Sequence, residues 1–269
     1  MTAWILDGDR LAEKIKSKLK RKLSKMDGKP VLATIIVGNN PVSELYVSIK
    51  EKECVNAGIE FIKYAYPTTI TGPQLIGIIE TLNNERIIDG ILIQLPLPKK
   101  FNTEKILKRI DPDKDVDGLN PISDTVPCAV KGIMRLLKEY KFDIKGKEIV
   151  IVNHSRLIGI PLTIKLLDDG ATVTICHKHT KNLKKHTLNA DILITAVGKR
   201  NIITEDMVKQ KAIVIDAGIC CFHEKTEGDV DFKNVRRKVA YLTPVPGGIG
   251  PMTIAMLIEN LIENVHKKR

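Results

Sequence analysis

Residues 148–161 read EIVIVNHSRLIGIP, and this stretch decides the predicted fold of the second half of the chain. The run from Glu148 to Val152 is short, apolar and rich in β-branched residues, as expected of a buried strand. A polar turn follows, and the segment from Pro161 to Asp169 is predicted to form a helix. A buried strand that leads through a short turn into a helix is typical of a nucleotide-binding α/β sheet.

Further apolar strands are predicted downstream of this unit, at 171–175, 191–197 and 212–216. Short apolar strands at this spacing indicate a doubly wound, Rossmann-like parallel sheet. The turn after the first strand holds one glycine, Gly159, where the usual dinucleotide fingerprint has three. From this turn alone, an ordinary strand-to-helix loop remains an open alternative.

The end of the second strand bears on the choice of cofactor. In NAD enzymes this strand commonly ends in a carboxylate that holds the ribose 2′-hydroxyl group. Here the strand ends in Cys176-His177-Lys178-His179, which offers positive charge and no acid to repel a 2′-phosphate. The sequence therefore favours NADP over NAD. The same residues could be metal ligands, but no partner cluster with zinc spacing occurs, so no metal site is predicted.

The first half of the chain also alternates between strands and helices, which implies parallel strands joined by right-handed crossovers. The predicted strands are 31–37, 59–65 and 90–95, and the predicted helices are 42–57, 71–84 and one that begins at Thr103. A loop rich in Asp, Pro and Gly, residues 111–127, is predicted to separate the two halves. Helices are also expected over 131–140 and from Thr253 to the end of the chain.

Composition limits the class of protein. The 269 residues are enough for one or two domains, and no apolar run reaches the length of a membrane span. The formal net charge of +11 suggests a nucleic acid, an anionic surface or an acidic small molecule as partner, or only a solvated surface. Aromatic residues make up 4% and the lysines are scattered, which argues against nucleic acid. Five cysteines without CxxC spacing indicate reduced thiols in a cytoplasmic protein.

Several polar positions in apolar surroundings are candidates for chemistry. Tyr46 and Lys50 lie four residues apart on a predicted helix and share a face. Gln94 interrupts an apolar strand near its carboxyl end, where open α/β sheets bind ligands. Asp117 lies between the two halves, and the loop 243–253 combines three prolines with three glycines. Each alone has an ordinary structural alternative: surface or core packing, an Asx turn for Asp117 and a rigid connector for the loop.

Taken together, the motifs resemble the bifunctional methylenetetrahydrofolate dehydrogenase/methenyltetrahydrofolate cyclohydrolase family over nearly the whole chain. Three strings are long and specific: QLPLP at 94–98, DVDG at 115–118 and PVPGGIGPMT at 244–253. The other matching segments are YVSIK at 46–50, the turn 155–161, VIDAG at 214–218 and GDVD at 228–231.

The resemblance implies an α/β fold of two domains with a cleft between them. Residues 1–121 would form a folate-binding catalytic domain, on which the C-terminal helix 252–269 packs, and residues 122–251 a Rossmann-like dinucleotide-binding domain. It also implies a homodimer that pairs through the nucleotide domains, with tetrahydrofolate derivatives as substrates and no nucleic-acid or membrane partner. The implied reactions are oxidation of 5,10-methylenetetrahydrofolate by NADP and hydrolysis of the methenyl product to 10-formyltetrahydrofolate.

The resemblance also assigns roles to residues. Lys50 is the central catalytic group, Gln94 orients it, Tyr46 contacts the folate, and Asp117 accepts hydrogen bonds from the pterin. The other implied substrate-binding residues are Leu95, Pro246, Gly247, Gly248, Pro251 and Thr253. The implied cofactor-binding residues are Asn153, His154, Ser155, Ile158, Gly159, His177, Lys178, Ala196, Val197, Gly198, Gly218 and Ile219.

Two departures from the family pattern keep alternatives open. Many members have Gly-Arg-Ser at the nucleotide turn, where this chain has Asn153-His154-Ser155, so that NAD remains possible as the cofactor. Many also have Pro-Cys-Thr-Pro where this chain has Ala129-Val130 after Pro127-Cys128. A member with a single activity, or a non-catalytic folate-binding relative, is a further alternative.

Overall fold

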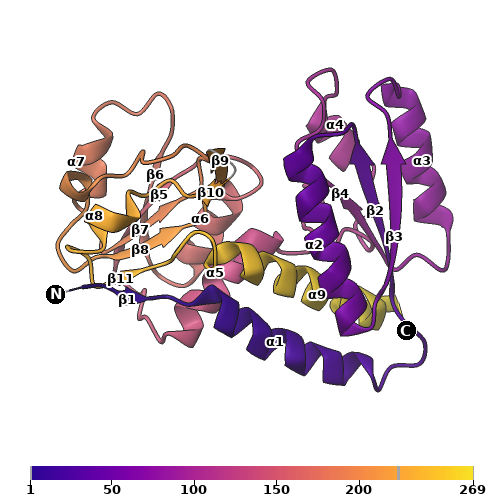
Figure 1. Ribbon diagram of the computed structural model, residues 1–269, viewed down its shortest axis with the longest axis horizontal. Helices are drawn as coiled ribbons and strands as arrows, with labels where there is room; N and C mark the ends of the chain where they lie inside the picture. Colours follow the sequence, from indigo (N-terminus) through magenta and orange to yellow (C-terminus); the bar gives the residue numbers. More distant parts are fainter. Residues whose placement is uncertain (1, 223–224, 269) are drawn as a thin grey trace. The chain divides into compact units, whose positions relative to one another are not determined.

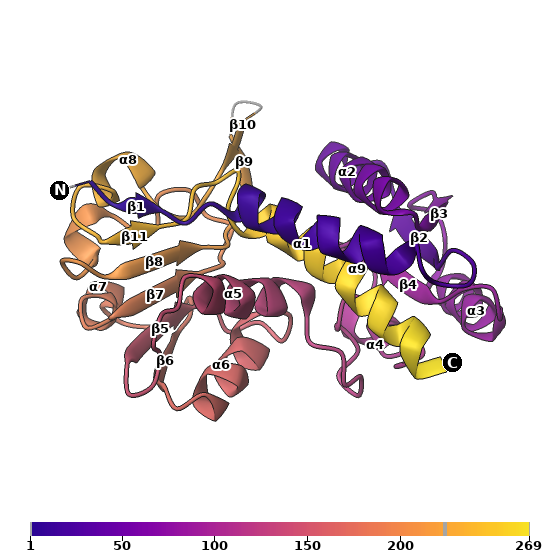
Figure 2. The same ribbon diagram turned by 90° about the horizontal axis from the view of Figure 1, so that it is seen from below.

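The computed structural model describes residues 2–222 and 225–268, and Figures 1 and 2 show its ribbon from two sides. The chain divides into two compact units. The three-stranded unit comprises residues 13–128 and 254–269, and the six-stranded unit comprises residues 1–12 and 129–253. The main sheet of each unit is wholly parallel, which confirms the predicted α/β class.

The sheet of the three-stranded unit has the order β3-β2-β4. Its strands are β2 (Val31–Val37), β3 (Glu60–Tyr66) and β4 (Gly90–Ile93). Every residue of the central strand β2 is buried, whereas every residue of the edge strand β3 is exposed or half-buried. Figures 1 and 2 show α2 (Pro41–Ala57) and α3 (Gly72–Asn84) on opposite faces of this sheet, as two right-handed crossovers in opposite directions require. The short helix α4 (Thr103–Leu107) follows β4.

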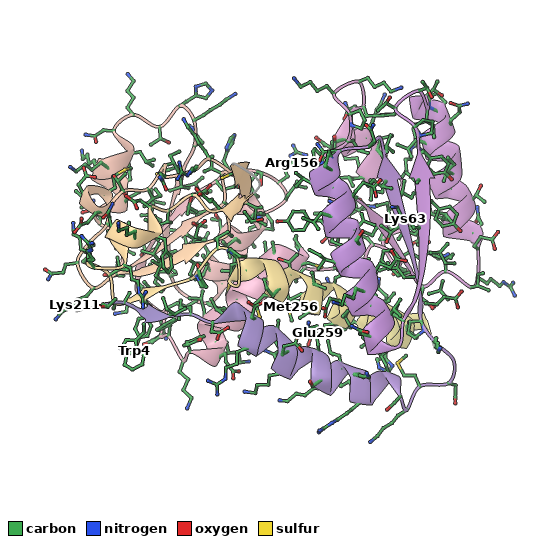
Figure 3. All side chains as sticks on the ribbon, in the orientation of Figure 1. Trp4, Lys63, Arg156, Lys211, Met256 and Glu259 are labelled. Carbon is green, nitrogen blue, oxygen red and sulfur yellow. The ribbon has the colours of Figure 1, made fainter. Side chains whose placement is uncertain are left out.

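Local signals fix the ends of α2, which carries two of the candidate residues. The Asn40 side chain accepts hydrogen bonds from the backbone N–H groups of Val42 and Ser43 at 3.0 and 3.1 Å. Gly58 ends the helix at φ 99°, a conformation that glycine adopts without a steric penalty. An ion pair of 2.6 Å between Glu44 of α2 and Lys63 of β3 connects the helix to the sheet. Figure 3 labels Lys63. These contacts set the orientation of the α2 face that holds Tyr46 and Lys50.

The sheet of the six-stranded unit has the order β1-β11-β8-β7-β5-β6. From β5 the chain first adds β6 on one side and then crosses to β7, β8 and β11 on the other. This reversal beside β5 is a topological switch point, where doubly wound sheets bind nucleotides. The strands are β1 (Trp4–Ile5), β5 (Glu148–Val152), β6 (Thr172–Cys176), β7 (Ile192–Thr195), β8 (Ile213–Asp216) and β11 (Tyr241–Leu242).

Helices and one hairpin complete the six-stranded unit. Helix α6 joins β5 to β6, and α7 lies between β6 and β7. A core of buried apolar side chains that includes Val150, Leu193 and Val214 holds the sheet against its cover. The elements are α5 (Cys128–Glu139), α6 (Gly159–Asp168), α7 (Leu183–Thr187), the 3-10 helix η1 (Glu205–Met207), α8 (Phe232–Val235) and the antiparallel strands β9 (Cys220–Phe222) and β10 (Lys225–Glu227).

The N-terminal boundary of the units differs from the predicted limit of 1–121. Strand β1 pairs with β11, with Trp4 opposite Tyr241, so residues 1–12 belong to the six-stranded unit. The backbone N–H of Asp7 also donates to the Tyr140 hydroxyl group at 2.9 Å. Two residues form β1, too few for a periodic pattern in the sequence.

The last helix, α9 (Ile249–Lys268), begins four residues before the predicted start at Thr253. Pro251 lies in its first turn, where backbone N–H groups have no partner within the helix and proline is tolerated. Helix α9 crosses from the six-stranded to the three-stranded unit after Thr253, and α1 (Gly8–Leu23) crosses after Ala12. Two predicted strands also end early, at Ile93 and Thr195.

None of the helices in the described part of the chain combines the length and the apolar character that a membrane crossing needs.

Candidate functional site

Lys50 and Gln94 form a hydrogen-bonded pair in the three-stranded unit. Lys50 lies on α2, and Gln94 follows the last residue of β4 directly. The Lys50 Nζ atom donates to Gln94 Oε1 at 2.9 Å, and Gln94 Nε2 donates to the Leu95 carbonyl oxygen at 2.6 Å. The second bond fixes the amide so that its oxygen faces the lysine. Gln94 is buried, whereas Lys50 is half-buried, so part of the lysine side chain is accessible to a ligand.

Asp117 belongs to the same group. Burial raises the pKa of its carboxyl group above the ordinary value, while the positive charge of Lys50 and a hydrogen bond with the Cys128 thiol lower it. Two residues before Asp117, Asp115 forms a parallel bridge with Ile91 of β4. Asp117 therefore lies, like Gln94, at the carboxyl edge of the sheet. Tyr46 lies one turn before Lys50 on α2 and is half-buried. The structure thus brings Lys50, Gln94 and Asp117 together.

Several residues that the sequence analysis missed hold Asp117 in place. The Asp115 carboxylate accepts the backbone N–H groups of Gly118 and Asn120 at 3.0 and 2.9 Å. Burial is the main cause that raises the pKa of Asp115 to about 6. From α9, Asn260 Nδ2 donates to the carbonyl oxygens of Val116 and Val126 at 3.0 and 3.1 Å. Asp115 lies two residues before Asp117 and could have been identified from the DVDG string.

Steric constraints explain why the DVDG string has a glycine at position 118. Gly118 has φ 67°, a left-handed conformation, and a Cβ atom there would lie 2.5 Å from the Thr125 carbonyl oxygen and 2.6 Å from the Pro127 nitrogen. Any larger residue would displace the loop that carries Asp117.

The loop 243–253 belongs to the six-stranded unit, with the beginning of α1. The Gly247 carbonyl oxygen accepts the backbone N–H groups of Gly8 and Asp9 at 2.9 and 3.1 Å. A Cβ atom at Gly8 would lie 1.9 Å from the Gly248 carbonyl oxygen, so the two backbones are in close contact. The predicted loop is non-helical only as far as Gly248, so Pro246, Gly247 and Gly248 precede α9, whereas Pro251 and Thr253 lie in its first turns. Their role toward a folate stays a prediction.

Asn153 organises the turn after β5. Its Oδ1 atom accepts the backbone N–H groups of Ser155 and Gly159 at 2.8 and 3.0 Å, as well as the Ser155 hydroxyl group at 2.8 Å. Its Nδ2 atom donates to the Ala196 carbonyl oxygen at 2.5 Å, at the end of β7. The Ser155 Oγ atom accepts the backbone N–H of Ile158 at 3.1 Å. A Cβ atom at Gly159 would lie 2.2 Å from the Asn153 carbonyl oxygen, so only glycine fits there.

A group of three histidines lies at the carboxyl ends of β5 and β6. The ring centroids of His154 and His177 are 5.2 Å apart, and those of His177 and His179 are 5.9 Å apart. All three side chains are exposed, as is that of Lys178 between them. No acidic residue occurs from 170 to 190, so the chemistry of this donor set suits an anionic ligand.

The predicted cofactor residues after β7 and β8 lie close together. A Cβ atom at Gly198 would be 3.1 Å from the Ile219 carbonyl oxygen. Val197 and Ile219 are apolar yet 44% and 39% exposed. An exposed apolar pair next to a switch point is suited to cover a planar ring of a ligand.

Within residues 2–222 and 225–268, no group of three or more His, Cys, Asp or Glu side chains is placed to hold a metal ion.

A parallel sheet with basic side chains at its switch point, joined to a separate α/β unit with a lysine site, defines a nucleotide-dependent α/β enzyme. Residues 6–117 match the family described as tetrahydrofolate dehydrogenase/cyclohydrolase, catalytic domain, and residues 127–269 match its NAD(P)-binding domain. The chain therefore belongs to the tetrahydrofolate dehydrogenase/cyclohydrolase family, as its motifs indicate.

Individual relatives cover the whole chain. The bifunctional protein FolD of Sulfurihydrogenibium sp. (strain YO3AOP1) is 48% identical over 98% of each chain. A crystal structure of the bifunctional enzyme FolD from Campylobacter jejuni, 43% identical, matches with a TM-score of 0.95 over 99% of this chain and 100% of that one. The Trypanosoma brucei enzyme, in complex with NADP and an inhibitor, is 30% identical and matches with a TM-score of 0.95 over 100% of this chain and 99% of that one.

Proposed function

We propose that this protein oxidises 5,10-methylenetetrahydrofolate with NADP and hydrolyses the resulting 5,10-methenyltetrahydrofolate to 10-formyltetrahydrofolate. The observation that carries the proposal is the Lys50–Gln94 pair beside Asp117 in the part of the chain that matches the family's catalytic domain. Both activities belong to the family, and residues 6–117 and 127–269 match its catalytic and NAD(P)-binding domains.

Lys50 is the group that accepts a proton during hydrolysis. Its Nζ atom donates one N–H to Gln94 Oε1, 2.9 Å away, and this bond orients the amine. Once the amine has released a proton, its lone pair can accept a proton from the water molecule that attacks the methenyl carbon. Gln94 acts through Lys50, because its own amide is fixed by the Leu95 carbonyl oxygen.

Asp117 is the group that binds the pterin. A carboxylate can accept two N–H bonds from the donor-rich edge of the ring system. The half-buried position and the nearby charge of Lys50 favour a strong bond there, since solvent competes less in a desolvated site. Tyr46, half-buried on the same helix face as Lys50, is assigned to contact with the folate.

NADP, when bound, supplies the acceptor for the hydride that leaves the methylene carbon. The 2′-phosphate is assigned to His154, His177 and Lys178, with His179 beside them. The absence of acidic residues from 170 to 190 supports NADP rather than NAD. A steady-state comparison of the two nucleotides tests this choice, and a clear preference for NAD would contradict it.

The decisive experiment on the active site replaces Lys50. We expect Lys50→Met to abolish cyclohydrolase activity, measured by the absorbance decay of methenyltetrahydrofolate, while NADP binding persists. The matched control is Lys52→Met, an exposed lysine on the same helix, which should leave both activities unchanged. Full hydrolysis by the Lys50→Met variant would contradict the proposal.

The protein is also proposed to form a homodimer through its nucleotide-binding domain. Ile160, Ile164 and Leu167 form a stripe on α6 and are 42%, 54% and 52% exposed. Ile175, on the neighbouring edge strand β6, is exposed as well. An apolar stripe beside an open sheet edge supports pairing of two copies. Sedimentation should give a dimer for the wild type and a monomer for Ile164→Glu, and an unchanged dimer in that variant would contradict this surface.

A cytoplasmic location is proposed because the described cysteines form no disulfide bonds. Cys54, Cys128, Cys176 and Cys220 are all free, and the first three are buried.

A further inference from the structure

Two buried carboxylates lie at the carboxyl ends of β7 and β8. Asp216 is the last residue of β8, and Asp229 lies two residues after the end of β10. They belong to the VIDAG and GDVD strings, in which only Gly218 has an assigned role, that of a cofactor-binding residue. A fully buried carboxylate is costly unless its oxygens accept hydrogen bonds, so the partners of both groups define what they do.

Asp229 binds the backbone that leaves β7. Its Oδ2 atom accepts the Thr195 hydroxyl group and the backbone N–H of Val197, both at 2.6 Å. Its Oδ1 atom accepts the backbone N–H of Lys199 at 2.7 Å. Both oxygens are therefore engaged by one turn, residues 195–199, which contains three of the predicted cofactor-binding residues.

Asp216 binds the backbone that leaves β8 and the segment that carries Asp229. Its Oδ1 atom accepts the backbone N–H groups of Gly218 and Asp229 at 2.9 and 3.1 Å. Its Oδ2 atom accepts the backbone N–H of Val230 at 2.9 Å. The two carboxylates thus form a chain in which Asp216 holds Asp229 and Asp229 holds the turn after β7.

The glycines of both strings make room for this arrangement. A Cβ atom at Gly218 would lie 2.1 Å from Asp229 Cγ, and a Cβ atom at Gly228 would lie 2.0 Å from Asp216 Oδ2. Neither glycine has a positive φ, so their reason is close approach and not backbone conformation. Each glycine therefore belongs to the site of the other string's carboxylate.

Burial raises the pKa of Asp216 to about 7, and the neighbouring Asp229 carboxylate adds to the effect. Near neutral pH the pair thus tends to carry less than two full charges, although six donors converge on it. Such a group fixes loops without presenting a strong negative field to an anionic ligand.

We propose that Asp229 and Asp216 are positioning residues of the dehydrogenase reaction, which fix the turns after β7 and β8 so that Val197 and Ile219 support the nicotinamide half of NADP. The inference rests on the proposed function, because the adenosine half is assigned to the histidines at the ends of β5 and β6. A dinucleotide that crosses the switch point then lies with its other half at the ends of β7 and β8. The two carboxylates contact the protein backbone and act on the cofactor only through it.

The experiment uses the full-length protein and the variant Asp229→Asn. An amide has one acceptor oxygen and faces at least one backbone N–H with its own N–H₂ group. We expect the Kd for NADP, from a fluorescence titration with NADPH in competition, to rise by about 10- to 100-fold. The dehydrogenase kcat/KM falls by at least that factor. Hydrolysis of added methenyltetrahydrofolate, assigned to the three-stranded unit, stays within about twofold.

Two further variants keep the test informative if Asp229→Asn folds poorly. Thr195→Val removes only the hydroxyl donor to Asp229, and Thr195→Ser keeps it. Thr195→Val should weaken NADP binding, and Thr195→Ser should restore it to the wild-type value. The matched control is Asp231→Asn: Asp231 caps α8 by accepting from Asn234, and NADP binding should not change.

The inference is overturned if Asp229→Asn binds NADP within twofold of the wild type, or, where that variant folds poorly, if Thr195→Val binds NADP as tightly as Thr195→Ser. The proposed function is tested separately by the two activities of the wild type. If the inference fails, the wild-type protein still shows both activities. If the proposed function fails, the wild-type protein lacks them, and this is seen before any variant is made.

Discussion

Each unit contains a buried aspartate that shapes a turn by accepting backbone N–H groups, but what the turn presents differs. In the three-stranded unit Asp115 holds the turn that carries Asp117, and the Asp117 side chain is near Lys50. In the six-stranded unit Asp216 holds the segment that carries Asp229, and the oxygens of Asp229 accept hydrogen bonds from the protein's own backbone. The first unit thus offers reactive side chains, and the second offers a shaped backbone. Proton transfer needs the former and placement of a cofactor needs the latter.

The largest expected effect concerns stability against pH. The pKa of Asp216 is raised from 3.8 to about 7, so the folded state holds its proton more tightly than the unfolded state. That stabilisation is complete below pH 4 and is lost as the pH rises through about 7. Relative to the wild type, Asp216→Asn should therefore gain up to about 4 kcal/mol in free energy of unfolding between pH 4 and pH 7.

Urea unfolding at several pH values measures this difference. Asp115→Asn is the counterpart in the other unit, and its gain should end near pH 6, where the raised pKa of Asp115 lies. If the difference in free energy of unfolding between Asp216→Asn and the wild type does not change with pH, the raised pKa of Asp216 is contradicted.

The next effect isolates the side-chain site. Asp117→Ala removes the acceptor assigned to the pterin, and the KM for methylenetetrahydrofolate should rise about 100-fold, as for loss of a charged hydrogen bond. The Kd for NADP should not change. Intact folate kinetics would return Asp117 to the role of a turn residue.

The reverse effect isolates the backbone site. Gly159→Ala places a methyl group 2.2 Å from the Asn153 carbonyl oxygen, which must displace the turn or the start of α6. The Kd for NADP should rise about 30-fold, on the scale of a lost backbone contact network. Cyclohydrolase activity should persist. Gly77→Ala, at an open position on α3, is the control. Unchanged NADP affinity would show that the turn tolerates the methyl group.

The smallest effect concerns a residue far from the site in sequence. Asn260→Leu keeps the size of the side chain but leaves the carbonyl oxygens of Val116 and Val126 without this donor. The loop before Asp117 should loosen, and the KM for the folate should rise about fivefold to tenfold, with NADP binding unchanged. Kinetics equal to those of the wild type would remove Asn260 from the support of Asp117.

Contacts that depend on local spacing were accessible from the sequence. Tyr46 and Lys50 share a face because they are four residues apart on a capped helix, and Gln94 stood out as the polar residue in an apolar strand. The parallel sheets followed from the alternation of strands and helices. These features need only the periodicity of the chain and its turns.

Contacts that join distant segments were not accessible. Asp229 meets Thr195 across 34 positions, and Asn260 meets Val116 across 144. Trp4 of β1 lies opposite Tyr241 only because the sheet brings two distant segments of the chain together. No local pattern encodes such pairs, since the fold itself determines which segments become neighbours.

Helices α1 and α9 each belong to both units, and this has a consequence for dissecting the protein. A fragment of residues 129–253 would begin after β1, so β11 would become a bare sheet edge open to pairing with other chains. A fragment that ends before residue 254 would lose the apolar contact that Leu261 makes at Gly90, the first residue of β4. Independent expression of either unit thus requires a rejoined chain: residues 1–12 linked to 129–253, and 13–128 linked to 254–269.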